Sequence, residues 1–351
     1  MKTILIIGAG GFIGGFIARR ALELGYDTYV GVRASTSRHY LDDPRLKFLT
    51  FDYDDPEQVA KTLLESHPEA GRWDYIIWNL GATKCANFAD FNRINYLYVR
   101  DFVDKLIELD MIPERFLYMS SLSALGVGDE KDYKPLDSHT IPQPNTRYGV
   151  SKIKTETYLE TLPSFPWIIF RPTGVYGPHE KDYLMMIKSI DSHWDFSVGY
   201  RRQMLTFIYV DDLVEAMFQA LSAQSEKVLR HKYIISEDRS YTQKEFREIV
   251  KRHLGRSAVI PVKMPLWAVY AASAVAEKVA AMRGKASTLN RDKFIIMRQR
   301  NWNCDISDAK RDFGFSPRFS LDRGIEATVK AYLEDKARLR LKKTRDLGLD
   351  K

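Results

Sequence analysis

The sequence predicts an α/β protein whose core is a doubly wound parallel sheet. The chain opens with a short apolar run, residues 4–7, which breaks directly into a glycine-rich turn and then into helical periodicity. Segments with strand character then alternate with helical segments, and each return to a parallel neighbour needs a crossover helix. The chain of 351 residues shows no short-period repeat that would indicate a solenoid.

The composition is that of an ordinary globular protein with a large core, since 45% of the residues are hydrophobic. Cys85 and Cys304 are too few for a disulfide framework or a cysteine zinc site, and we expect no metal. No secretory leader precedes the first strand, which favours the cytoplasm. The net charge of +7 is spread along the chain apart from a basic tail at 336–351, so we expect a small-molecule substrate and no nucleic acid.

The expected elements follow one another regularly through the N-terminal half. The first helix has an apolar stripe and ends at Gly25, which suits a left-handed cap. We expect strands at residues 4–7, 28–32, 46–51, 75–80 and 115–119, and helices at residues 12–24, 56–66, 88–108 and from near Thr146.

The glycine-rich turn predicts a dinucleotide site. Gly8, Gly11 and Gly14 fall at three-residue intervals, which lets the backbone turn sharply, approach a pyrophosphate and pack the helix on the strand. Arg33 follows the second strand, where an acidic residue would bind the adenosine 2′-hydroxyl. A guanidinium suits a 2′-phosphate, so we expect NADP in preference to NAD. Asp52, after the third strand, can accept a hydrogen bond from the adenine amino group.

Residues suited to acid–base chemistry follow the fifth strand. Ser120, Ser121 and Ser123 lie at the carboxyl end of that strand, and Gly81 follows the fourth, at the edge where open α/β sheets bind ligands. Tyr148 and Lys152 are four residues apart in the next expected helix. They therefore share one helical face, and a helix beside the fifth strand can bring them to Ser121.

The chemistry expected of these three residues is proton transfer coupled to hydride transfer. A phenol loses its proton near pH 10 unless positive charge stabilises the phenolate. Lys152 supplies one such charge and an oxidised nicotinamide a second, so Tyr148 can exchange a proton with a substrate oxygen while hydride moves. Ser121 would donate a hydrogen bond to that oxygen. We therefore predict Ser121, Tyr148 and Lys152 as the catalytic residues.

Together these motifs resemble the extended short-chain dehydrogenase/reductase family, also called the NAD-dependent epimerase/dehydratase family. Two further motifs match it in order and spacing, RPTGVYGP at residues 171–178 and FIYVDD at residues 207–212. The resemblance implies a Rossmann-type domain at 1–178, with 205–236 returning to it. It also implies a smaller substrate-binding lobe at 179–204 and 237–335, followed by the basic tail.

The resemblance also assigns residues to the cofactor. Asn95 matches a family asparagine near the nicotinamide, and Tyr148 and Lys152 contact the cofactor as well. Family members often form homodimers through the helices that carry Asn95 and Tyr148. The residues implied to line the cofactor are Gly8, Gly11, Phe12, Ile13, Asp52, Tyr53, Leu80, Gly81 and Pro172.

Departures from the family pattern bear on the substrate. Sugar-nucleotide members commonly place an arginine two residues before the phenylalanine of the FIYVDD motif, where this chain has Leu205; Arg201 and Arg202 lie nearby and could compensate. The segment 289–315 looks like that of members acting on sterol-like or lipid ketones. We therefore expect an NAD(P)-dependent oxidoreductase that interconverts a secondary alcohol and a ketone on a steroid- or lipid-like substrate. The alternatives are a nucleotide-sugar epimerase or dehydratase and a non-enzymatic NADP-sensing regulator.

Other segments have structural interpretations. Asp211 and Asp212 sit where a helix begins, and we expect them to cap it. The apolar segment 265–282 is too short and interrupted for a transmembrane span; it is either a core helix, a pocket wall or a face resting on a membrane. We expect no stable membrane insertion, and peripheral contact stays open. Aromatic residues in the segment 194–200 could line a pocket or fill the lobe.

Overall fold

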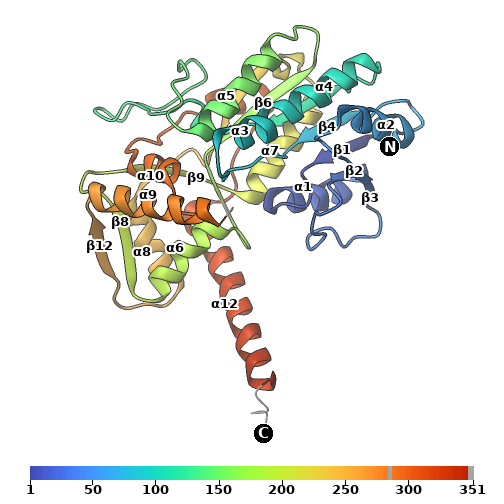
Figure 1. The fold of residues 1–351 in the computed structure, drawn as a ribbon. Coiled ribbons are helices and arrows are strands. Elements are labelled where there is room, and N and C mark those ends of the chain that lie inside the picture. Colours follow the sequence, from blue (N-terminus) through green and yellow to red (C-terminus); the bar gives the residue numbers. More distant parts are fainter. Residues whose placement is uncertain (284–286, 347–351) are drawn as a thin grey trace.

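The chain folds around a seven-stranded sheet. A computed structural model describes residues 1–283 and 287–346. The strands are β1 (Thr3–Ile7), β2 (Asp27–Val32), β3 (Lys47–Thr50), β4 (Tyr75–Trp78), β5 (Arg115–Met119), β6 (Trp167–Pro172) and β10 (His231–Ile235). All are parallel and lie in the order β3-β2-β1-β4-β5-β6-β10 (Figure 1). The prediction of a doubly wound α/β fold is confirmed.

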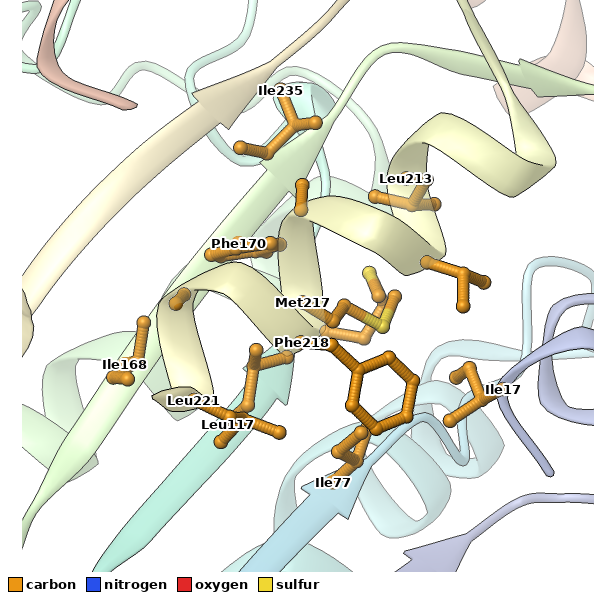
Figure 2. Close-up of a cluster of buried hydrophobic side chains, with 14 of the residues drawn as sticks. Ile17, Ile77, Leu117, Ile168, Phe170, Leu213, Met217, Phe218, Leu221 and Ile235 are labelled. Atoms are coloured by element: carbon orange, nitrogen blue, oxygen red, sulfur yellow. The ribbon is translucent and has the colours of Figure 1, made fainter. Parts of the chain in front are cut away.

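Helices cover both faces of this sheet. One face is covered by α1 (Phe12–Glu23) and α7 (Val210–Ser222), and the other by α2 (Pro56–Ser66), α4 (Tyr98–Glu108) and α5 (Arg147–Glu160). Side chains of α7 project onto the strands in Figure 2, where Phe218 and Met217 lie among residues of the sheet.

Strand β1 contributes side chains to the hydrophobic core on both faces of the sheet, because successive side chains of a strand point to opposite sides. Ile4 and Ile6 belong to the cluster under α1 and α7. Leu5 and Ile7 belong to the cluster under α2 and α4. None of the four exposes any surface, which explains the unbroken apolar run in the sequence.

A second group of elements lies away from β1–β3 in Figure 1. It contains a three-stranded sheet of β7 (Gly174–Tyr176), β9 (Met204–Tyr209) and β11 (Ser240–Thr242), and a pair of β8 (Trp194–Val198) and β12 (Ile260–Met264). The helices of this group are α6 (Lys181–Asp191), α8 (Gln243–His253), α9 (Leu266–Met282), α10 (Arg291–Arg298) and α12 (Leu321–Asp346), whereas α11 (Ser307–Phe313) packs against β10 of the main sheet. Two short helical turns are η2 (Leu122–Ala124) and η3 (Glu226–Val228).

The C-terminal helix α12 is continuous across the expected start of the basic tail at residue 336. Its first turns are buried through Leu321, Ile325 and Val329, and its far end projects from the body in Figure 1. Lys336 pairs with Asp191 of α6. Residues 347–351 of the tail lie outside the described residues.

The helix expected over 88–108 is three pieces, α3 (Phe88–Asn92), the π-helical turn η1 (Arg93–Leu97) and α4. In η1 the backbone N–H of Tyr98 donates to the carbonyl of Arg93, five residues back. Such turns insert one extra residue into a helix and are frequent at functional sites. The wide turn carries Asn95, and apolar periodicity could not reveal a one-residue insertion.

Asp211 and Asp212 do not cap α7, contrary to expectation. The residue that precedes α7 makes no side-chain capping bond. Asp212 instead accepts hydrogen bonds from the backbone nitrogens of Arg318 and Phe319, at 2.9 and 2.8 Å. Asp211 accepts one from Arg19 of α1 at 2.9 Å. The two carboxylates therefore fasten other segments to α7.

Of the three interpretations of residues 265–282, the core helix is wrong. This segment is α9, and among its large apolar side chains only Val269 is buried; Trp267 is 76% exposed and Met282 79% exposed. Within the described residues, no helix is both long enough and apolar enough to cross a bilayer.

Candidate active site

The three glycines of the first turn have three different surroundings. Gly8 has a positive φ of 84°, and a Cβ there would lie 2.5 Å from the backbone nitrogen of Leu80. A Cβ at Gly14 would collide with the carbonyl oxygen of Gly8. Gly11 is exposed, and a Cβ there would make only an ordinary contact, 3.6 Å from the carbonyl oxygen of Gly8. Two glycines thus allow close packing of β1, β4 and α1, and the third leaves the turn open.

The amino end of α1 suits an anion. Gly11 is its N-cap, no side chain caps the helix, and its first turn carries no acidic residue. The first backbone N–H groups are therefore available to a phosphate at the positive end of the helix dipole. β1 lies between β2 and β4, so the order of the strands reverses here, and such a point is where open sheets bind ligands. The turn fits a dinucleotide pyrophosphate.

The residues expected at the adenosine end lie after β2 and β3. The Arg33 side chain is exposed, and no carboxylate of the described residues pairs with it. The guanidinium of Arg38 instead stacks 4.2 Å from the ring centre of Phe48. Asp52 is exposed, and its Oδ1 accepts a hydrogen bond from the backbone nitrogen of Asp54 at 3.1 Å. Arg33 and Asp52 are thus both open to a ligand.

Tyr53 is part of the core. Its ring packs 5.5 Å from Phe51, 5.7 Å from Trp78 and 5.6 Å from Tyr98, measured between ring centres. The hydroxyl is buried and has no hydrogen-bond partner among the described residues. Tyr53 therefore supports this end of the sheet from within.

The other residues implied to line the cofactor lie at the same edge of the sheet. Phe12 and Ile13 form the first turn of α1 and are partly buried, as is Leu80 after β4. Pro172 is the last residue of β6 and is buried. The edge is therefore mostly apolar on either side of the glycine turn.

Ser121, Tyr148 and Lys152 come together at the end of β5. Ser121 follows that strand, and Tyr148 and Lys152 lie one turn apart on α5. The Nζ of Lys152 donates a hydrogen bond of 2.7 Å to the backbone carbonyl of Met119 and lies 5.9 Å from the ring centre of Tyr148. The Met119 carbonyl therefore holds Nζ of Lys152 near the phenol ring of Tyr148.

Burial shifts both titrating groups away from their ordinary pKa values. It raises the pKa of Tyr148 to about 12, while the neighbouring Ser121 hydroxyl acts to lower it. Burial lowers the pKa of Lys152 to about 7, and the nearby Glu156 carboxylate acts to raise it. At neutral pH the phenol of Tyr148 is therefore protonated.

Asn95 joins the site to the loop after β4. Its side chain is fully buried; Oδ1 accepts from the backbone nitrogen of Ala82 at 2.7 Å, and Nδ2 donates to the Ala82 carbonyl at 3.0 Å. Nδ2 also donates to the Ser151 hydroxyl at 2.9 Å. A Cβ at Gly81 would lie only 3.1 Å from Nζ of Lys152. Asn95 thus holds the Gly81–Ala82 backbone against the lysine.

A buried ionic cluster supports the site from behind, and the sequence analysis missed it. Glu156 and Arg171 are 0% and 1% exposed, and Nη2 of Arg171 donates to Oε2 of Glu156 at 2.5 Å. The Ser120 hydroxyl donates to the other carboxylate oxygen. The signal in the sequence was Glu156 four residues after Lys152, hence on the same helical face. The cluster ties β5, α5 and β6 together.

A second ionic group attaches the C-terminal half to the start of α5. Arg147, the residue before Tyr148, donates to Glu277 of α9 and to Asp292 of α10, each at 3.1 Å. These bonds fix α9 and α10 beside the catalytic helix.

Asp182 joins three further segments around the site. At the start of α6 it accepts from Lys84, in the loop after β4, at 2.9 Å, and from Lys293 of α10 at 2.8 Å. Burial opposes its ionisation, yet the two lysines hold its pKa below the ordinary value. The loop after β4 is therefore tied to the C-terminal half.

The substrate-side residues lack a fixed cation on β9. Leu205 lies opposite Tyr241 in β11 and is partly buried. Arg201 and Arg202 precede β9 and are exposed. Within the described residues, no three His, Cys, Asp or Glu side chains gather so as to hold a metal ion.

Comparisons with known proteins give the family. The model of the NAD dependent epimerase/dehydratase family matches residues 4–236. A putative UDP-glucose 4-epimerase of Methanocaldococcus jannaschii is 23% identical over 72% of this chain and 82% of its own length. A 3beta-hydroxysteroid-dehydrogenase/decarboxylase isoform of Arabidopsis thaliana is 21% identical over 95% of this chain and 62% of its own length.

The solved structures agree on the fold. The dTDP-glucose 4,6-dehydratase of Bacillus anthracis, in complex with NAD, superposes with a TM-score of 0.74 and 16% identity over 96% of this chain and 98% of that one. Other relatives are also named dTDP-glucose 4,6-dehydratases, so the expected closeness to hydroxysteroid dehydrogenases is not confirmed. Since the family model covers most of the chain, this protein belongs to the NAD dependent epimerase/dehydratase family of NAD-dependent enzymes.

Proposed function

We propose that this protein is an NAD(P)-dependent oxidoreductase that interconverts a secondary alcohol and a ketone. The observation that supports this most strongly is the grouping of Ser121, Tyr148 and Lys152 at the edge of the sheet next to the open glycine turn. A bound nicotinamide dinucleotide supplies or accepts the hydride in this chemistry.

In the proposed mechanism Tyr148 carries the proton. With its pKa raised to about 12, the phenol is protonated at neutral pH and can give its proton to the oxygen of a ketone. The Ser121 hydroxyl donates a hydrogen bond to that oxygen and stabilises the charge that develops there. Lys152, when protonated, stabilises the phenolate that remains.

The residues at the glycine turn would hold the dinucleotide. The open face of Gly11 and the free N–H groups of α1 suit the pyrophosphate, and Asp52 suits the adenine amino group. Arg33 is exposed and free of carboxylates, which supports a preference for NADP over NAD. In this proposal residues 1–178 and 205–236 hold the cofactor, and residues 179–204 and 237–335 shape the substrate site.

We further propose an apolar substrate, such as a steroid or another lipid. Leu205 stands where a sugar-nucleotide enzyme would carry its phosphate clamp, and it packs against the cluster of β7, β9 and α12. The aromatic and aliphatic side chains exposed on β8 and α9 belong to the same half of the molecule. We expect the protein to act as a homodimer through α4 and α5.

The second candidate is a nucleotide-sugar epimerase or dehydratase. The names of several relatives favour it, and the same three residues can serve either reaction. The exposed Arg201 and Arg202 offer cations for a diphosphate. A non-enzymatic NADP sensor is disfavoured, since a sensor has no need of the Tyr148 and Lys152 pair.

The two enzyme candidates differ in what happens to the cofactor. We would incubate the protein with NADPH or NADP and with steroid, lipid-ketone and nucleotide-sugar substrates, and follow the absorbance of the reduced nicotinamide. Steady consumption or formation of NADPH with an apolar ketone or alcohol supports the proposal. Turnover of a UDP- or dTDP-sugar at constant absorbance contradicts it in favour of the second candidate.

A further inference from the structure

The corner built from residues 194–202 and 260–283 holds an unusual share of exposed apolar surface, and we call it the α9 corner. Of the twenty-two large hydrophobic residues exposed in the described chain, ten lie here. They include Trp267 at 76%, Met282 at 79% and Tyr200 at 67% exposure. Patches of this kind mark interaction sites, since isolated surface residues would be scattered over the molecule.

The outer face of α9 is one continuous stripe. Trp267, Ala271, Val275, Lys278 and Met282 follow one another at intervals of three or four residues, so they share one side of the helix. Between the larger side chains the helix presents a shallow, open apolar surface made of small side chains, Ala271, Ala272, Ala276 and Ala280, with Val275 and Val279 beside them. The stripe is apolar except for Lys278, whose long stem can lie along the apolar surface while its charge stays in water.

The exposed charges of the α9 corner are all positive. Arg201, Arg202, Lys263, Lys278 and Arg283 are exposed. The two acidic residues in these segments are engaged elsewhere: Asp195 is buried against Arg247, and Glu277 pairs with Arg147 and Arg291.

We propose that the α9 corner docks on the surface of an anionic lipid bilayer. Aromatic and aliphatic side chains on one helix face, with lysine and arginine around them, are the pattern of helices that lie in the interfacial layer. The charge argues against a second copy as the occupant, because a two-fold interface would bring the five cations of each copy together. An anionic surface would neutralise them.

The docked position also places lipid beside the catalytic helix. The inner side of α9 carries Glu277, which holds Arg147, the residue before Tyr148. The bilayer would therefore lie across one helix from the site, which suits the uptake of a lipid-like substrate. This last step rests on the proposed function, whereas docking itself does not and is measured without substrate.

The test is sedimentation of the full chain with vesicles. We would compare phosphatidylcholine vesicles with vesicles of phosphatidylcholine and phosphatidylglycerol, at low and high salt. The double variant Trp267→Ser/Lys278→Glu alters the corner, and Leu64→Ser/Lys61→Glu introduces the same two residues in place of an exposed apolar side chain and a lysine of α2. The docking proposal predicts binding to the anionic vesicles, weakened by salt, and at least about tenfold weaker partition for the α9 variant alone.

Three outcomes would overturn the proposal. The first is no binding of the unaltered chain to anionic vesicles, and the second is an equal loss in the α2 and α9 variants. The third is a change of molar mass in solution for the α9 variant with no change in vesicle binding, which would identify the corner as a contact between copies. Both variants should unfold at the same denaturant concentration as the unaltered chain, which separates docking from folding. Activity toward any substrate is a separate readout and decides only the proposed function.

Discussion

Tryptophan and charged side chains are buried at the edge of the main sheet, whereas the same kinds of side chain are exposed at the α9 corner. At the sheet, Trp78 exposes no surface, and the charges of Glu156 and Arg171 are buried against each other. At the corner, Trp267 is 76% exposed and five cations face water. Burying charged groups costs free energy, so a buried pair such as Glu156 and Arg171 is retained where it fixes the positions of neighbouring elements. A cluster of exposed apolar side chains instead indicates an external partner. The difference separates the part that holds the chemistry from the part that meets a surface.

The largest effect on stability is expected at the buried pair. Glu156→Gln leaves the Arg171 guanidinium buried without a counter-charge and should lower the free energy of unfolding by roughly 3–5 kcal/mol. The matched change Glu65→Gln breaks only the exposed pair with Lys61, 3.8 Å apart, and should cost less than about 1 kcal/mol. Urea unfolding of both variants measures this. Equal losses would show that the buried cluster does not hold β5, α5 and β6 together.

An intermediate effect is expected at the exposed cation of the cofactor edge. Arg33→Ala should weaken NADPH binding by about 10- to 100-fold, because a charge-assisted pair with the 2′-phosphate is lost, and should leave NADH almost unchanged. Arg38→Ala is the control, since its guanidinium stacks on Phe48. Fluorescence titration with both reduced cofactors measures the ratio. An equal loss for NADPH and NADH refutes the assignment.

The smallest effect on stability is expected at the corner. Trp267→Ser should change the free energy of unfolding by less than about 0.5 kcal/mol, because its side chain is already in water. Trp78→Ala, in the core, should cost about 3–5 kcal/mol. Thermal and urea unfolding compare the two. A large loss at Trp267 would mean that the residue is packed, and the corner would then not be a free surface.

The sequence was most informative where a local pattern fixes the structure. The apolar run of β1, the glycine spacing and the Tyr148–Lys152 interval predicted the main sheet and brought Ser121, Tyr148 and Lys152 to one place. Each signal depends on neighbours within a few residues of one another. The pattern was enough to identify the family, which the family model confirms for residues 4–236.

Local sequence patterns could not predict contacts between segments that are far apart in the chain. The π-helical insertion at Asn95 leaves apolar periodicity intact, and Arg171, the partner of Glu156 on α5, comes from strand β6. Asp212 lies where a capping residue would, but its partners are 106 and 107 positions away. The sequence pattern of an apolar helix such as α9 also does not distinguish a helix covered by protein from one left exposed.

The central claim is that Tyr148 carries a proton in catalysis. The variant Tyr148→Phe keeps the ring and removes the hydroxyl, and its kcat for ketone reduction should fall by roughly 10²–10⁴ while its affinity for the reduced cofactor stays the same. Tyr148, with its pKa raised to about 12, stays protonated through neutral pH, whereas the pKa of Lys152 is lowered to about 7. Ketone reduction by the unaltered enzyme should therefore fall as the pH rises through about 7, where Lys152 loses the charge that stabilises the phenolate. A Tyr148→Phe enzyme that reduces the same ketone at an unchanged rate with the same pH profile would contradict the account.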